Sequence, residues 1–399
     1  MRSKAALLIP FLSFAFALPA AAQTDEQFKQ CNGPEPALAI LGCTAVIESR
    51  DSKPPLRSRA LVNRGNAYVT RGQLDRAVAD FDRAVMLDAK NSTAFAARGA
   101  YHQAQGDSTK ALADFNQAIG INPRDANAFL QRANFHLIAG EADRALADYD
   151  ASIRLDSKNV LAYVNRGEAH RVQGEDDRAI ADFDAALKLD PSFAAAYDNR
   201  GVALTGKGEY DRAIADFGNA IRLDPKSVSA YSHRAIAYES KGIHDRALAD
   251  FATAIGLNPD DPAIYANRGN IYLEQNDLDR AIADFNHAIM IDAMDAQAFN
   301  NRGSAYAKKG DLTRALADFD MAIRLNPRLP NAFANRGLVL VKTGQDGPAI
   351  ADFNAALAAN PKDALSLYNR GVAKQKTGDS VGGDVDVIAA RAIDPNVGK

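Results

Sequence analysis

From Ser58 to Val397, small, apolar and polar residues recur with a period of 34 residues, ten times in succession and without insertion or deletion. We number each copy from 1 to 34, with Ser58 at position 1 of the first. Position 8 is Gly or Ala in all ten copies, position 20 is Ala in nine, and position 24 is Phe or Tyr in nine. A helix advances about 100° per residue, so positions 4, 8 and 11 share one face of a helix, and positions 20, 24 and 27 share one face of another. The pattern therefore predicts two amphipathic helices in each copy.

The breaks between these helices are periodic as well. Glycine at position 15, as in Gly72, Gly106 and Gly140, suits a turn between the two helices. Position 32 is proline in seven copies, and proline cannot continue a helix. Helix–turn–helix units of this length stack into a solenoid. A solenoid presents a long surface instead of one deep pocket, which favours binding over catalysis.

This combination of a small residue at position 8, Ala at 20 and 27, an aromatic at 24 and Pro at 32 resembles the tetratricopeptide repeat (TPR) family. The resemblance extends from residue 58 to residue 397. It departs from the family at position 7, which is Arg throughout, and in the tenth copy, which is degenerate. The resemblance implies an all-α, right-handed superhelical solenoid whose first helices line a concave groove. It also implies a scaffold that binds a protein or an extended peptide, without enzyme activity, cofactor or metal.

Residues 1–22 precede the repeats. Arg2 and Lys4 come before an apolar stretch, and residues 20–22 fit an A-x-A cleavage site, so we expect a signal peptide cleaved after Ala22. The stretch is shorter than the roughly 20 residues that span a bilayer, so no stable membrane insertion of the mature chain is expected. The mature chain is then periplasmic or secreted. With a net charge of −3 and no basic stripe, the chain is a poor candidate for binding nucleic acid.

Residues 23–57 are interpreted as a partial repeat that caps the first copy. They contain the only two cysteines, Cys31 and Cys43. In an oxidising compartment a lone pair favours a disulfide, which could stabilise this segment by about 3 kcal/mol at most. The alternative is two free thiols, with Cys43 as a small core residue. At the other end we expect the tenth copy to act as a cap, with Asp384 and Asp386 making its last helix polar.

Two polar columns accompany the core pattern. Position 7 is Arg and position 23 is Asp in all ten copies. This predicts a structural ladder of Arg–Asp pairs, the alternative being an arginine track for an acidic ligand. Position 6 lies away from the core face and is Asn in seven copies: Asn63, Asn165, Asn199, Asn267, Asn301, Asn335 and Asn369.

An asparagine amide can both donate to and accept from a peptide backbone. The column is similar to the asparagine ladder in the TPR region of O-linked N-acetylglucosamine transferase, and we take these seven residues as the candidate peptide-binding residues. The alternative is that the amides bond to neighbouring helices or to water. A second apolar set in copies three and four would face the same groove or pack between first helices: Leu130, Leu137, Ile138, Leu161, Val164 and Val172.

The chain shows no catalytic or cofactor-binding motif. His102, His136 and His170 occupy position 11 of consecutive copies, but equivalent positions are separated by two helix packings of about 8–10 Å each. A zinc ion needs its nitrogen ligands within about 2.1 Å, so this column does not predict a metal site. The principal alternative function is an architectural or assembly factor in cell-envelope biogenesis or secretion, using the convex face or the repeat ends. The sequence leaves the partner and the oligomeric state open.

Overall fold

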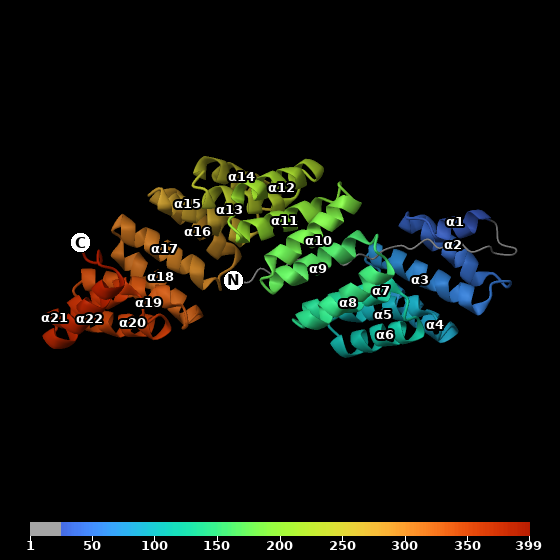
Figure 1. Ribbon diagram of the computed structural model, residues 1–399, viewed down its shortest axis with the longest axis horizontal. Helices are drawn as coiled ribbons and strands as arrows, with labels where there is room; N and C mark the ends of the chain where they lie inside the picture. Colours follow the sequence, from blue (N-terminus) through green and yellow to red (C-terminus); the bar gives the residue numbers. More distant parts are fainter. Residues whose placement is uncertain (1–24) are drawn as a thin grey trace. The chain divides into compact units, whose positions relative to one another are not determined.

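The computed structural model describes residues 25–399, and every regular element within them is an α-helix (Figure 1). The predicted signal peptide, residues 1–22, lies outside the described residues. The chain divides into two compact units with the boundary between Glu209 and Tyr210. The prediction of an all-α array of tandem helix pairs is confirmed in both units.

The first unit holds the helices α1 (Asp25–Cys31), α2 (Pro36–Glu48), α3 (Pro54–Thr70), α4 (Leu74–Leu87), α5 (Ser92–Ala104), α6 (Ser108–Ile121), α7 (Ala126–Ile138), α8 (Ala142–Leu155), α9 (Val160–Val172), α10 (Asp176–Leu189) and α11 (Ala194–Gly206). The second unit holds α12 (Tyr210–Leu223), α13 (Val228–Ser240), α14 (His244–Leu257), α15 (Pro262–Glu274), α16 (Leu278–Ile291), α17 (Ala296–Lys309), α18 (Leu312–Leu325), α19 (Pro330–Lys342), α20 (Asp346–Ala359), α21 (Ala364–Lys376) and α22 (Ser380–Ile393).

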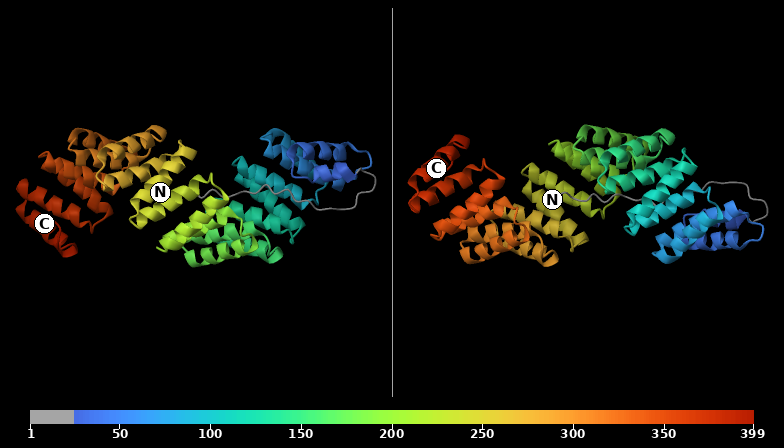
Figure 2. Two further views of the ribbon diagram at one scale, coloured as in Figure 1. Left: turned by 90° about the horizontal axis from the view of Figure 1, so that it is seen from above. Right: turned by 90° about the horizontal axis from the view of Figure 1, so that it is seen from below.

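Within each unit, consecutive helices pack against one another, as Figures 1 and 2 show. First helices of successive copies also touch, for example α3 with α5, α5 with α7, α15 with α17 and α17 with α19. Among the described residues of either unit, no two successive second helices are in contact. The first helices are therefore the crowded layer and lie on the inner side of each unit.

In most copies the close approach of the two helices depends on glycine at position 8. A Cβ atom on Gly303 would stand only 2.8 Å from Cε1 of Phe319, whose ring is 1% exposed. Gly269 meets Phe285 in the same way in the preceding copy. The aromatic side chain at position 24 thus fills the space that the missing side chain leaves, which explains why both positions repeat.

The turns follow the predicted glycine pattern with one variation. Glycine at position 15 adopts a positive φ, for example 71° at Gly72 and 87° at Gly310. In the seventh copy Asn276 occupies this position and is also left-handed, with φ 60°. Asparagine is one of the few residues other than glycine that tolerate this conformation, so the turn is preserved there.

The N-terminal segment forms a short helix pair. Helix α2 packs against both α1 and α3. Cys31 and Cys43 are joined by a disulfide, the first of the two alternatives considered above. Ala39 and Val46 are buried with Cys43 on the same side of α2, which matches the spacing of the second helix of a repeat. The capping role of this segment stays a prediction.

One expectation about the last copy is wrong. Asp386 does not make the outer face of α22 polar, because it is 5% exposed and accepts hydrogen bonds from Arg370 Nε and Nη2, both at 2.7 Å. Lys374 Nζ lies 2.8 Å from the same carboxylate. Burial works against the charge, but the hydrogen bonds from Arg370 and Lys374 prevail and hold the pKa of Asp386 below its usual range. Asp386 is a member of the position-23 column, and the ladder determines where it points.

Candidate functional site

The predicted binding asparagines all lie on first helices, the inner layer of each unit. Asn165 is only 3% exposed, and its amide donates to Asn134 Oδ1 at 2.9 Å. A ligand therefore cannot reach Asn165 directly. The other six are half-buried: Asn63, Asn199, Asn267, Asn301, Asn335 and Asn369.

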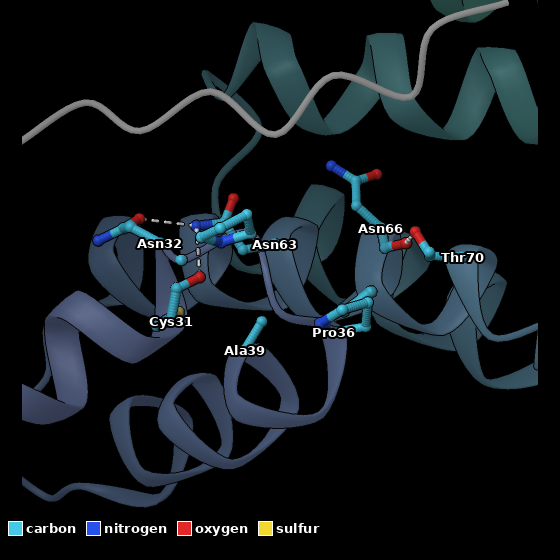
Figure 3. A pocket seen from close by; sticks show the side chains of 10 residues that line it. Cys31, Asn32, Pro36, Ala39, Asn63, Asn66 and Thr70 are labelled. Atoms are coloured by element: carbon cyan, nitrogen blue, oxygen red, sulfur yellow. Dashed lines mark hydrogen bonds between the residues drawn. The ribbon is translucent and has the colours of Figure 1, made fainter. Parts of the chain in front are cut away.

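Several of these amides bond to the preceding first helix, as one of the two sequence interpretations expected. Asn63 donates to Asn32 Oδ1 at 2.9 Å and approaches the carbonyl of Cys31 at 3.4 Å (Figure 3). Asn63, Asn32 and Cys31 line a small hollow of about 60 Å³ together with Asn66 and Thr70. Asn369 differs, because its amide donates to the carbonyl of Leu365 in its own helix at 2.8 Å.

In the second unit the amides form a continuous relay across three copies. Asn335 Nδ2 donates to Asn300 Oδ1 at 3.0 Å. Asn300 Nδ2 donates to Asn301 Oδ1 at 3.1 Å, and Asn301 Nδ2 donates to Asn270 Oδ1 at 2.8 Å. Each amide in such a chain polarises the next one. The relay runs from α19 through α17 to α15.

The relay leaves hydrogen-bonding groups at both of its ends. Within residues 25–399, neither Nδ2 of Asn270 nor Oδ1 of Asn335 has a hydrogen-bond partner, and both residues are half-buried. One end therefore offers a donor and the other an acceptor. Sequence reasoning found Asn301 and Asn335 but missed Asn270 and Asn300. The available signal was asparagine at position 9 of the seventh copy (Asn270) and at position 5 of the eighth (Asn300).

In the second unit, Asn300, Asn301 and Asn335 of the relay line a hollow of about 330 Å³. Its wall contains the predicted residues Asn301 and Asn335, and Leu338 and the exposed Leu365 add an apolar part. The other lining residues are Gln297, Ser304, Asn331, Ala334, Phe353, Asp363 and Ser366. The hollow combines amides for a polar backbone with apolar surface for a side chain.

The first unit has a comparable hollow of about 360 Å³. Asn63 and Asn32 line it, and so does Asn127, whose buried Oδ1 has no hydrogen-bond partner within the described chain. Its other lining residues are Arg59, Val62, Asn91, Ser92, Thr93, Asn122, Arg124, Asp125, Ala126, Asp156 and Asn159. Each unit thus contains an amide-rich hollow on its inner layer.

The apolar set of copies three and four divides between the two interpretations. Leu130 and Val164 are buried at 0% and 2% exposure, so they pack between helices. Ile138 and Val172, at position 13, are 55% and 58% exposed. Leu137 and Leu161 are half-buried and pack against the core around Tyr149. The exposed pair is the part of this set that a ligand can reach.

The Arg–Asp ladder is present as a structural element. In copies one to four and six to ten, Arg at position 7 donates through Nε and Nη2 to both oxygens of Asp at position 23, at 2.5–2.9 Å. The third nitrogen commonly reaches position 25 of the preceding copy, as Arg302 Nη1 reaches Asn286 at 2.7 Å. The hydrogen bonds that Arg302 donates to Asp318 raise the pKa of Arg302 further above its usual range. With these donors engaged, the column is not an open track for an acidic ligand.

The three consecutive histidines have acidic neighbours in their own copies. Nδ1 of His136 lies 2.7 Å from Glu141 Oε2, and Nδ1 of His170 lies 2.7 Å from Glu175 Oε2. The contact with histidine is the main reason why the pKa of each glutamate lies below its usual range. His102 Nε2 lies 3.9 Å from Asp114. Residues 25–399 contain no group of three His, Cys, Asp or Glu side chains that could hold a metal ion.

One acidic group on the inner layer is perturbed in the opposite direction. Burial, and then the nearby Glu274, raises the pKa of Glu239 above its usual range, although His244 partly offsets this. By contrast, Glu168 forms an ion pair with Arg171, which donates to it at 2.6 and 2.8 Å.

Among the helices of the described chain, none combines the length and apolarity needed to cross a membrane.

Comparison with protein families gives a consistent result along the chain. Models described as tetratricopeptide repeats match residues 58–91, 96–160, 139–194, 199–262 and 296–329. A model described as a TPR repeat matches residues 269–310. These matches together span well over half of the sequence. Among curated proteins, the comparison found no match.

Solved structures share the fold. A chain of the APC/C hetero-tetramer Cut9–Hcn1 is 17% identical, with a TM-score of 0.51 over 93% of this chain and 85% of that chain. A tetratricopeptide repeat protein from Parabacteroides merdae is 19% identical, with a TM-score of 0.50 over 62% of this chain and 98% of that chain. At these identities the likeness concerns the fold alone.

Proposed function

This chain belongs to the tetratricopeptide repeat family, whose members bind proteins or peptides, and we propose that it is an exported interaction scaffold that holds an extended segment of a partner protein along its first helices. Members of the family are generally scaffolds and not enzymes. The observation that carries the proposal is the amide relay from Asn335 to Asn270, three of whose residues (Asn300, Asn301 and Asn335) line a hollow of about 330 Å³.

The chemistry of the relay suits a peptide backbone. An extended peptide presents N–H donors and C=O acceptors in alternation. The relay offers an acceptor at Asn335 and a donor at Asn270, and its internal bonds hold the amides in place before a ligand arrives. Groups held in position lose less conformational freedom on binding, which favours affinity. Backbone contacts of this kind recognise an extended chain without requiring a particular sequence.

The surroundings of the relay restrict the partner further. Leu338 and the exposed Leu365 provide apolar surface in the same hollow, so an aliphatic or aromatic side chain of the segment can pack there. Asp363 also lines the hollow and favours a segment without a dense acidic cluster. We therefore propose an extended segment with one or more apolar side chains.

The test uses a displayed library of random peptides of about 12 residues, which span about 40 Å when extended. Peptides selected on the mature chain, residues 23–399, are measured by fluorescence anisotropy against the triple variant Asn270→Ala, Asn301→Ala and Asn335→Ala, which removes both ends of the relay. We expect the dissociation constant to rise about 100-fold, because each lost hydrogen bond is worth about 1 kcal/mol.

The matched control is Gln117→Ala, which removes an exposed amide from the second helix α6. Its affinity for the selected peptides should equal that of the unchanged chain, and far-UV circular dichroism should show the same helix content for all three proteins. Equal peptide affinity in the triple variant would place the binding surface elsewhere and refute the proposed site.

Export is the second part of the proposal. The Cys31–Cys43 disulfide supports it, because such bonds persist mainly in oxidising compartments. We expect the full chain, produced in a bacterium, to be recovered from the periplasmic or secreted fraction with Gln23 as its first residue. Intact-mass analysis of each fraction measures this directly. Recovery of uncleaved chain from the cytoplasm alone would contradict export.

A further inference from the structure

The outer face of α22, the last helix of the second unit, is apolar. Val381, Val385 and Ile388 are 78%, 61% and 69% exposed, and Ala392 is exposed beside them. Their spacing of four, three and four residues places them on one side of the helix as a continuous stripe. Isolated exposed apolar residues are ordinary on protein surfaces, but a row of large ones along a helix is typical of a contact surface.

Most earlier copies carry polar residues at two positions of this stripe. At position 18, Asp211 accepts from Lys241 of the following copy, and at position 25, Asn286 accepts from Arg302 at 2.7 Å. These contacts join one copy to the next. In the tenth copy the same two positions are Val381 and Ile388. The terminal face therefore lacks the acceptors that another repeat of this type would use, and it presents apolar surface in their place.

The stripe is complementary to itself. In an antiparallel pair of α22 helices related by a two-fold axis, Val385 of one copy lies opposite Ile388 of the other, and Val381 lies opposite Ala392. This register also brings Asp384 on the flank of the stripe against Arg391 of the other copy, twice by symmetry. Both residues are exposed, and Arg391 has no ion-pair partner within residues 25–399.

On the opposite flank of the stripe lie Gly382 and Ala389, and these small residues would allow two helices to approach closely. Asp384 keeps one carboxylate oxygen available, since Gln375 donates only to Oδ1, at 2.7 Å. We propose that the protein forms a two-fold symmetric dimer through the Val381–Val385–Ile388–Ala392 stripe of α22, with Asp384–Arg391 ion pairs on its flank. The inference does not depend on the peptide-binding proposal.

Analytical ultracentrifugation of the mature chain, residues 23–399, tests this assignment. The unchanged chain should sediment as a dimer at micromolar concentration. The double variant Val385→Asp, Ile388→Asp places charges in the proposed contact. The dissociation constant of the dimer should therefore rise by about 100-fold or more. Because both side chains are exposed in the single chain, helix content by circular dichroism should not change.

Two further variants make the test specific. Met86→Asp places a charge at an 84% exposed apolar position of α4 and should leave the dimer intact. Asp384→Arg alone should weaken the dimer, and the double change Asp384→Arg with Arg391→Asp should restore it, which distinguishes the two-fold register from other pairings. A monomeric unchanged chain, or a dimer that persists with Val385→Asp and Ile388→Asp, overturns the proposal.

Discussion

Replacing Phe285 with alanine should lower the free energy of unfolding by about 4 kcal/mol, because the change leaves a cavity between two helices that cannot move together. Phe285 is 0% exposed, and its ring lies where Gly269 has no side chain. It belongs to a core that links copies seven, eight and nine through Tyr306, Phe319 and Val339. The loss therefore weakens the neighbouring copies as well as its own. Urea unfolding followed by circular dichroism measures the effect.

Met290→Ala is the matched control for this change, because Met290 lies on the same helix α16 and is 74% exposed. Its removal should alter the free energy of unfolding by no more than about 0.5 kcal/mol. If Phe285→Ala cost as little as Met290→Ala, the contact between positions 8 and 24 would not be the basis of the helix pair.

Removing Arg302 should have the second-largest effect, about 3 kcal/mol of lost stability. Alanine at this position leaves Asp318, 6% exposed, without the guanidinium that binds both of its oxygens at 2.7 and 2.8 Å. The contact with Asn286 of the preceding copy is lost as well. A buried carboxylate without a partner is energetically unfavourable. The loss of stability should therefore exceed the contribution of an exposed ion pair, which is usually below about 1 kcal/mol.

A double-mutant cycle separates the pair from its surroundings. Arg302→Ala, Asp318→Ala and the double variant are compared by urea unfolding, and the double variant should cost clearly less than the two single changes added together. Arg222→Ala on the exposed side of α12 serves as the control and should be nearly neutral. Additive losses in the cycle would show that the two residues act independently and that the ladder is not a stabilising pair.

The repeat pattern predicted most of the fold because its constraints are local. Position 15 must turn the chain, and nine glycines and Asn276 all adopt the left-handed conformation there. The side chain at position 24 must fill the space above the small residue at position 8, and the aromatic residues found at position 24 are nearly all fully buried. The Arg–Asp ladder could be predicted for the same reason, since an Arg and an Asp recur at fixed separation in every copy. Each of these contacts is made within one copy, at a separation that the sequence repeats.

The terminal copy was predicted less well. Asp386 was expected, with Asp384, to make the last helix polar, but it takes the place that the predicted ladder gives it and points inward toward Arg370. The helical spacing of Val381, Val385 and Ile388 was present in the sequence, but the two aspartates beside them, Asp384 and Asp386, suggested a polar surface. Only the position of α22 against α21 shows which side of the helix is left uncovered.

The sequence by itself determined the repeat length, the helix pairs and the column of position-6 asparagines on the first helices. The tertiary structure decided which partner each amide finds. Asn165 is buried against Asn134, whereas Asn301 and Asn335 join a relay with Asn300 and Asn270. Asn300, Asn301 and Asn335 also line a hollow. The reason is physical: these hydrogen bonds cross from one copy to the next. Their geometry depends on how far apart and at what angle successive first helices pack, and no single copy of the pattern contains that information.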